Sequence, residues 1–261
     1  MTRDQAHAHR AAGDVALTEQ FDNHDGGRPE ATDRLAGETL HLIGDGGQTV
    51  IAFDTARELR VERDELSMVS GTVAELTYEA FPLREGFVSV VVRTDDRHST
   101  FLTLDAVSQR AISVTSALVG DGGKAVQEVS TFVQAGIEGP LTASFKVTEA
   151  LVGKRIQWRY SSTHAFEHIY LNPTAYCWHG LAGPERWIGD VDPYIAYELD
   201  HELYLFSWSE TVVPFNGAVI LDLQLWQSVG RFFGWDTDRD QAGQIVVGAE
   251  GTLLNVTRHE L

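Results

Sequence analysis

The strand-like stretch FVSVVVR at Phe87–Arg93 is followed 116 residues later by LYLFSWS at Leu203–Ser209. Both stretches are rich in β-branched and aromatic residues, which favours β-structure over helix. Three more landmarks repeat in the same order: Leu35-Ala36-Gly37 with Leu151-Val152-Gly153, Tyr78-Glu79 with Tyr197-Glu198, and Thr103-Leu104-Asp105 with Ile220-Leu221-Asp222. Their offsets of 116, 119 and 117 residues predict a duplicated structural unit. The alternative is two unrelated β domains that share generic strand patterns.

A repeat of this length has room for seven or eight short strands. Strands of this kind remove their exposed edges by closing into a barrel. The interior of an eight-stranded barrel holds either packed side chains or one small ligand. The sequence therefore predicts an all-β protein of two antiparallel barrels in tandem: a polar arm at 1–33, one barrel at 34–145 and a second at 146–261.

Charge and cysteine content narrow the classes of function. The 261-residue chain has a formal net charge of −18, which disfavours nucleic acid and anionic membrane as partners. The plain reason for such a charge is solubility. Cys177 is the single cysteine, so no disulfide can form within the chain, and neither a signal-peptide pattern nor a long apolar run is present. We expect a cytoplasmic protein, and the sequence leaves open whether it forms a homo-oligomer.

One strand of the second unit combines aromatic residues with a carboxylate. Period-two alternation places Tyr204, Phe206, Trp208 and Glu210 on one face. Glu210 then lies either at a barrel rim, paired in water, or inside an apolar pocket. In a pocket, desolvation would raise the pKa of its carboxyl group and make it a general acid.

Polar and aromatic side chains also alternate between residues 159 and 179. His168 and Tyr170 share one strand face, and Tyr176 and Trp178 share a face of the next strand. Tyrosine and tryptophan suit a ligand cavity because each offers an apolar body and one polar hydrogen. Arg159 is positioned to fix an anionic group by a two-pronged hydrogen bond. The alternative is that the aromatic residues are simply core.

No metal or cofactor is expected from the sequence. His164 and His168 are four residues apart, but on a strand this spacing separates them by about 13 Å. A nucleophile elbow, a phosphate-binding P-loop and a dinucleotide fingerprint are all missing.

Longer segments resemble those of the molybdenum cofactor biosynthesis protein F (MoaF) family. The strongest are Leu151–Arg155, Trp158–Ser161, Glu167–Asn172, Tyr176–Glu185, Leu203–Glu210, Gly230–Gly234 and Leu254–Thr257. The first unit is similar more loosely, through Asp33–Gly37 and Tyr78–Ala80. The resemblance implies a pair of lipocalin-like (calycin-type) domains and a link to molybdenum cofactor genes. By fold analogy it also implies likeness to small-barrel lyases, isomerases and cyclases that use no cofactor.

Two functions follow as expectations. The first is a cofactor-independent lyase, isomerase or cyclase acting on an aromatic or apolar small molecule. Its catalytic residues would be Glu210, His168, Tyr170 and Tyr176, and its substrate-binding residues Arg159, Trp178, Tyr204 and Trp208. The alternative is a lipocalin-type binding protein without turnover, or an accessory factor in molybdenum cofactor biosynthesis.

Overall fold

A computed structural model describes residues 26–69, 75–120, 126–236 and 240–258. Every regular element within these ranges is a β-strand, which confirms the all-β prediction. Most of the predicted N-terminal arm, residues 1–25, lies outside the described residues. Within them, no helix has the length and apolar character needed to cross a bilayer.

The chain forms two compact units. Among the described residues, one unit comprises 29–120 and 128–146, and the other comprises 26–28, 126–127 and 147–258. Each unit contains its own hydrophobic core.

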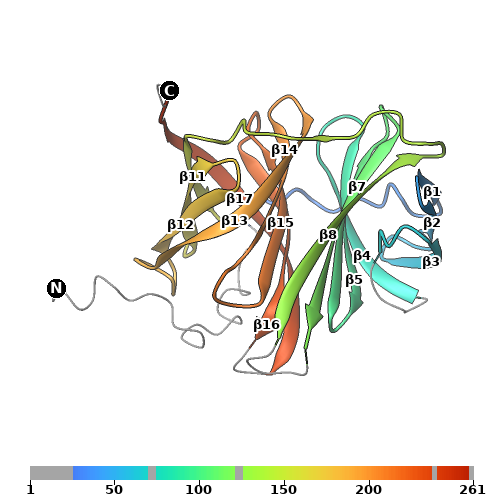
Figure 1. The fold of residues 1–261 in the computed structure, drawn as a ribbon, viewed down its shortest axis with the longest axis horizontal. Coiled ribbons are helices and arrows are strands. Elements are labelled where there is room, and N and C mark those ends of the chain that lie inside the picture. The colour runs from blue at the N-terminus through green and yellow to red at the C-terminus, as the bar shows by residue number, and fades with distance from the viewer. Residues whose placement is uncertain (1–25, 70–74, 121–125, 237–239, 259–261) are drawn as a thin grey trace. The chain divides into compact units, whose positions relative to one another are not determined.

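The first unit is a closed antiparallel barrel of eight strands, coloured blue to green in Figure 1. Its strands are β1 (Thr39–Gly44), β2 (Gly47–Ala52), β3 (Glu58–Asp64), β4 (Glu75–Pro82), β5 (Phe87–Asp95), β6 (His98–Asp105), β7 (Arg110–Val119) and β8 (Gln127–Ile137). Each strand pairs with the next in sequence, and the pairing of Leu42 with Ile137 joins β1 to β8 and closes the barrel.

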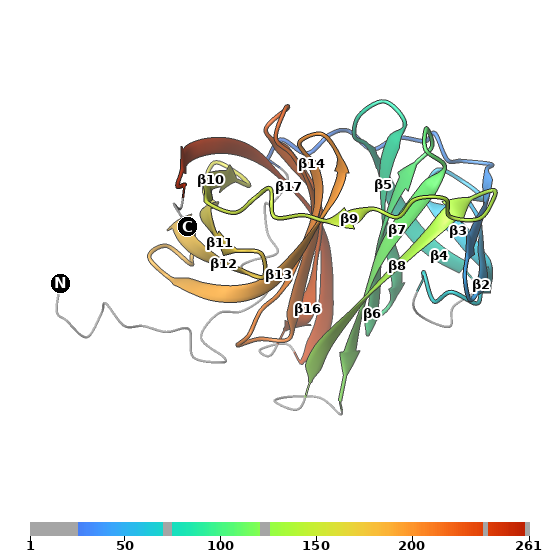
Figure 2. The ribbon, with the colours of Figure 1, turned by 45° about the horizontal axis from the view of Figure 1, so that its top comes forward.

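The second unit has the same plan and is coloured yellow to red in Figure 2. A short β9 (Lys146–Val147) precedes eight strands: β10 (Lys154–Arg159), β11 (Ala165–Asn172), β12 (Ala175–Ala182), β13 (Gly189–Asp200), β14 (Leu203–Ser209), β15 (Phe215–Asp222), β16 (Gln227–Asp236) and β17 (Gln241–Val256). Pairing of β10 with β17 and of β12 with β13 completes this barrel. The predicted tandem of barrels is confirmed.

Backbone conformation repeats along with the strands. Residues with a left-handed φ occur in the same order in both barrels: Gly37 and Gly153 (84° and 80°), Gly86 and Glu202 (81° and 55°), then Gln109 and Trp226 (52° and 53°). These pairs are separated by the offsets of the sequence repeat, 116 or 117 residues. Residues other than glycine rarely adopt a left-handed φ. Its recurrence at matched positions therefore indicates that the two barrels share the same set of turns.

A buried aspartate fixes the same turn in each copy. The Asp105 carboxylate accepts hydrogen bonds from the backbone N–H groups of Val107 and Ser108 (3.2 and 2.9 Å). Asp222 accepts the equivalent bonds from Gln224 and Leu225 (both 2.9 Å). The side chain thus takes the place of a backbone turn acceptor, which is a common use of aspartate.

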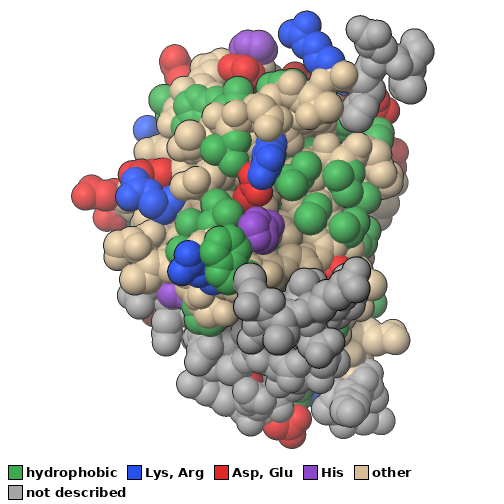
Figure 3. Space-filling view, turned by 90° about the vertical axis from the view of Figure 1, so that its left-hand side faces the viewer, with side chains coloured by type: hydrophobic (Ala, Val, Ile, Leu, Met, Phe, Trp, Pro, Cys, Tyr) green, Lys and Arg blue, Asp and Glu red, His purple; other side chains and the backbone are tan. Residues whose placement is uncertain are grey.

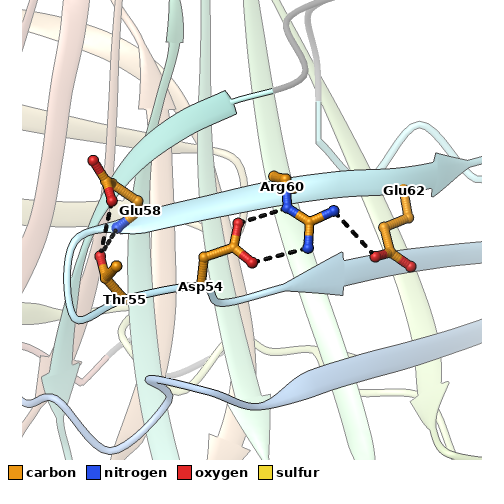
Figure 4. A network of polar contacts seen from close by, with 5 residues as sticks. All are labelled: Asp54, Thr55, Glu58, Arg60 and Glu62. Carbon is orange, nitrogen blue, oxygen red and sulfur yellow. Dashed lines mark hydrogen bonds and ion pairs between the residues drawn. The ribbon is translucent and has the colours of Figure 1, made fainter.

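The third strand was not expected, because its sequence ELRVERD is mostly charged. Leu59 and partly buried Val61 nevertheless alternate with exposed side chains, so β3 is a half-buried strand of ordinary pattern. Figure 4 shows its charged face, where Arg60 donates to both carboxylate oxygens of Asp54 at 2.7 and 2.9 Å. The Arg60 hydrogen bonds lower the pKa of Asp54. An exposed pair of this kind organises the turn but adds little stability.

The two cores differ in chemistry at matched positions. Val88, Val90 and Val92 project into the first core, whereas the corresponding residues of the second are Tyr204, Phe206 and Trp208. The first core is largely aliphatic and the second largely aromatic. One fold therefore carries two kinds of interior, and the aromatic interior contains the candidate site.

Candidate ligand-binding site

The second barrel contains a pocket whose lining is mostly aromatic. It is formed by Tyr160, Phe166, His168, Tyr176, Trp178, Trp208, Glu210, Phe215 and Phe232. The free space between these side chains, including open solvent at the mouth, is about 420 Å³. Small-molecule sites are typically apolar concavities with a few well-placed polar groups, and this lining has that character.

Strand alternation delivers these side chains to the interior. His168 on β11 lies directly opposite Trp178 on β12. Trp208 on β14 and Phe232 on β16 belong to the same buried cluster. Because all four strands are part of one closed barrel, side chains distant in the sequence converge on one space.

The aromatic rings pack mainly edge to face. The centroid of the Trp208 ring lies 6.0 Å from that of Tyr176 and 5.6 Å from that of Phe232, with interplanar angles of 70° and 81°. His168 packs against Tyr176 at 5.1 Å and against Trp208 at 6.2 Å. Such contacts are worth about 0.5–1.5 kcal/mol each beyond the area they bury, so the pocket walls are firmly held.

His168 is a neutral group in this pocket. Only 4% of the residue is exposed, and burial lowers its pKa to about 3. Its Nδ1 lies 3.5 Å from the Tyr170 hydroxyl, at the limit of a hydrogen bond. At neutral pH the imidazole therefore offers one donor and one acceptor but no positive charge. Any role of His168 at neutral pH therefore begins from the uncharged ring.

The tyrosines of the site remain protonated. Burial raises the pKa values of the Tyr160 and Tyr170 hydroxyl groups far above the ordinary tyrosine value of 10. For Tyr176, burial has the largest effect, and the nearby Asp192 and Glu210 carboxylates raise the pKa further. The phenols can thus donate hydrogen bonds, but they cannot supply a phenolate at neutral pH.

Glu210 provides the carboxylate of the lining. It follows the last residue of β14, and its backbone N–H donates to the Phe215 carbonyl at 3.0 Å. The residue is partly exposed, so it lies where the barrel interior meets solvent. Of the two locations that the sequence left open, the structure shows a rim position that also borders the pocket.

Asp192 is a buried carboxylate that the sequence analysis did not single out. Its Oδ2 accepts from Trp178 Nε1–H at 2.9 Å, and its Oδ1 accepts from the backbone N–H and hydroxyl of Thr211 at 2.8 and 3.0 Å. Burial raises its pKa, and these hydrogen bonds partly oppose the rise. Asp192 thereby fixes a pocket wall and the residue after Glu210. Alternation from Tyr194 would have placed it on the inner face.

Two of the predicted residues lie in the core beside the pocket. Tyr170 and Tyr204 are 1% and 4% exposed and belong to the aromatic cluster, but they are not among the lining residues. Tyr170 packs against Tyr176, with ring centroids 6.2 Å apart. They support the walls rather than face the free space.

Arg159, predicted to hold an anionic group, is not among the described residues that line the pocket. Trp158 points into the barrel, so the next residue on β10 points outward. The Arg159 side chain is 56% exposed and forms an ion pair with Glu250 on the neighbouring β17. The sequence pattern alone had not shown whether the Arg159 side chain faces the inside or the outside of the barrel.

A separate polar cluster covers the outer face of β10–β12. The buried Glu167 carboxylate forms an ion pair with Arg155 and lies 3.5 Å from Nδ1 of His179. Hydrogen bonding from Arg155 lowers the pKa of Glu167. Figure 3, which views this side of the molecule, shows acidic, basic and histidine side chains interspersed with apolar ones. We interpret the cluster as structural, because its charges neutralise one another.

Metal-binding groups are not brought together in the part of the chain that the structure describes. No set of three or more His, Cys, Asp or Glu side chains there is placed to hold an ion.

Two family models match the chain, one for each barrel. The MoaF N-terminal domain matches residues 15–120, and the MoaF C-terminal domain matches residues 145–257. The chain belongs to the MoaF family. The family's two-domain organisation corresponds to the two barrels and agrees with the resemblance found in the sequence.

Individual relatives extend this comparison. The chain is 40% identical over 123 residues to Protein MoaF of Klebsiella aerogenes, covering 47% of this chain and 46% of that protein. The match therefore spans about half the length of this curated MoaF protein. A crystal structure of a Burkholderia vietnamiensis protein, provisionally named a beta-lactamase, is 15% identical with a TM-score of 0.34. It covers 40% of this chain and 95% of that one, and so weak a likeness supports no conclusion.

Proposed function

We propose that the second barrel binds one small aromatic molecule in the pocket beside Trp208. The observation that carries this proposal is the lining itself, in which seven of the nine residues that the structure describes there are Phe, Tyr or Trp. Where Trp208 projects into this barrel, the matched residue of the first barrel is Val92. An aliphatic interior suffices to stabilise the fold, so the aromatic replacement needs another reason. A ligand with a flat apolar face provides one.

Binding of such a ligand is favourable on physical grounds. Each ring that stacks on or meets the edge of a ligand ring adds about 0.5–1.5 kcal/mol beyond the area buried. The walls are already packed and partly pinned by Asp192, so little side-chain entropy is lost on binding. The neutral His168 and the Tyr176 phenol can orient a polar substituent.

Catalysis is a second candidate, favoured by the convergence of Glu210, Tyr176 and His168 on one space. The Glu210 carboxylate would take a proton from one position of the ligand, and the resulting carboxylic acid would return it at another. The Tyr176 hydroxyl would stabilise negative charge developing on a ligand oxygen. This is an isomerisation without metal or nucleotide, and it leaves Glu210 unchanged.

Family membership supports a place for this binding activity beside molybdenum cofactor biosynthesis, to which the MoaF name is linked by the resemblance described above. In that setting the protein would be an accessory factor that holds a small molecule.

Benzyl alcohol is a suitable probe of the pocket, with binding followed by ligand-observed NMR. Trp208→Leu should weaken binding about tenfold, because it removes a stacking face and part of the buried area. Trp187→Leu is the matched control, since Trp187 is 63% exposed and outside the lining, and it should change affinity by less than about twofold. Equal binding by the two variants, or no binding by the unmodified protein, would show that the proposal is wrong.

The catalytic candidate needs a ligand retained through purification, detected by native mass spectrometry. In deuterium oxide the unmodified protein should exchange a proton of that ligand for deuterium, and Glu210→Gln should abolish the exchange. Exchange at the same rate in both proteins would leave binding as the function and remove Glu210 from any chemistry.

A further inference from the structure

The hydroxyl group of Tyr170 is paired with the His168 ring in the aromatic core. Tyr170 is 1% exposed there, and 3.5 Å separates its hydroxyl oxygen from Nδ1 of His168. Burial raises the pKa of the phenol, so Tyr170 keeps its proton. The neighbouring Trp158 indole can only donate a hydrogen bond and cannot receive that proton. Among the described residues, only His168 is placed to accept it.

This pairing decides which nitrogen of His168 carries the hydrogen. The imidazole is neutral, because burial lowers its pKa to about 3, so one ring nitrogen is an acceptor and the other a donor. If Nδ1 carried the hydrogen, it would donate to Tyr170 and leave the O–H of the phenol buried without an acceptor. A buried donor of this kind costs about 1–3 kcal/mol. Nδ1 is therefore the acceptor, and Nε2 carries the hydrogen.

The N–H group of His168 belongs to the part of the ring that borders the pocket. Nδ1 is turned toward Tyr170, which is not one of the described lining residues, whereas His168 itself is one of them. The other polar atom of the ring, Nε2, is thus the one available to a ligand. Tyr176 also lines the pocket, its ring centroid lies 5.1 Å from that of His168, and its phenol stays protonated. Two hydrogen-bond donors therefore lie in neighbouring parts of the lining.

We propose that the ligand carries a carbonyl oxygen next to its aromatic ring, and that this oxygen accepts hydrogen bonds from His168 Nε2–H and the Tyr176 hydroxyl. This inference rests on the proposed function and specifies its ligand class. A carbonyl oxygen has two lone pairs in the plane of the group, so it can accept from both donors at once. A ligand without an acceptor would displace water from these donors and leave them unpaired. Tyr170 is a positioning residue, because it sets the donor on His168 without lining the pocket.

Acetophenone and α-methylstyrene test this inference, because they share one skeleton and differ only in a carbonyl oxygen against a CH2 group. Each compound is titrated against the full chain by ligand-observed NMR near pH 7. Acetophenone should bind at least about fivefold more tightly, since α-methylstyrene leaves the two donors without an acceptor. His168→Phe keeps a flat ring and removes one donor, and it should reduce this preference by at least about threefold.

Phe166→Leu is the matched control. Phe166 lines the same pocket and lies two residues before His168 on β11, but its side chain has no polar group. The substitution should weaken the binding of both compounds by a similar factor and keep the preference for acetophenone. Loss of the preference in this variant would trace it to the shape of the pocket and overturn the assignment to His168.

The hydrogen on Nε2 can be observed without any ligand. In a 15N-labelled protein, long-range 1H–15N correlation distinguishes protonated from unprotonated ring nitrogens, and comparison with His168→Phe identifies the signals of His168. We expect a protonated Nε2 and an unprotonated Nδ1 from pH 7.5 down to pH 5, because the pKa of the ring is about 3. A hydrogen on Nδ1 would overturn the donor role of His168 whether or not a ligand binds.

The binding outcomes distinguish the inference from the proposal beneath it. If the two compounds bind equally, or if the preference survives in His168→Phe, the carbonyl assignment is overturned while the binding function stands. If neither compound binds, both the inference and the proposed function fail.

Discussion

The buried imidazole of His168 should make the second barrel sensitive to acid. In the unfolded chain a histidine titrates near pH 6.5, whereas in the barrel burial lowers the pKa of His168 to about 3. Between these values the unfolded chain binds a proton that the folded chain does not. Stability therefore falls as the pH is lowered through 6.5 and stops falling from this cause only near pH 3.

The size of the effect follows from linkage. Between pH 7.5 and pH 5 a group with these two pKa values removes about 2 kcal/mol from the free energy of unfolding. His168→Phe keeps a flat ring and removes the titrating group. The variant should therefore lose about 2 kcal/mol less than the unmodified protein over this interval. Other titrating groups, including the buried Asp192, contribute equally to both proteins and cancel in the comparison.

Urea unfolding followed by tryptophan fluorescence measures this difference. All six tryptophans belong to the second unit, so the signal reports that barrel alone. His201→Phe is the control, because it makes the same substitution at a side chain that is 80% exposed and is not part of the aromatic core. If His168→Phe loses as much stability between pH 7.5 and pH 5 as the unmodified protein does, the burial argument is refuted.

Two further substitutions test the walls of the pocket. Asp192→Asn keeps the shape of the side chain but removes the charge that accepts hydrogen bonds from Trp178 and Thr211. We expect it to lower the free energy of unfolding in urea by about 1–3 kcal/mol and to weaken benzyl alcohol binding, and an unchanged unfolding midpoint would contradict the role given to this carboxylate. Gly217→Ala would place a methyl group 2.1 Å from the Trp208 ring and force the indole to move. The substitution should lower the free energy of unfolding by at least about 1–3 kcal/mol and abolish benzyl alcohol binding. Full binding by this variant would show that Trp208 does not form the wall.

Much of the fold could be predicted because the same strand pattern occurs in both halves of the sequence. Gly37 and Gly153, like Asp105 and Asp222, could be matched as landmarks of the repeat, and the structure adds that the first pair has a left-handed φ and the second pair accepts the turn hydrogen bonds. Strand β3 was missed because charged residues occupy its outer face, and alternation is hard to recognise when only Leu59 and Val61 face inward. Hydrophobic pattern identifies a strand poorly when half of it is charged.

The candidate site was predicted in part for the same reason. Once strands are assigned, alternation determines which side chains share a face, and His168, Tyr176, Trp178 and Trp208 do line one interior space in the structure. Alternation could not reveal which face of β10 was inward, and the structure places the Arg159 side chain on the outer face. Which side chains border free space and which fill the core depends on packing across the barrel, so the position of Tyr204 required the structure.

The central claim is that the aromatic interior of the second barrel holds a small aromatic molecule. A crystal soaked in 4-bromobenzyl alcohol tests it most directly, since the anomalous signal of bromine locates the ring without prior assumptions. The account predicts one bromine peak between Trp208 and Phe232. A peak only on the outside of the barrel, or an interior left empty at saturating concentration, would contradict it.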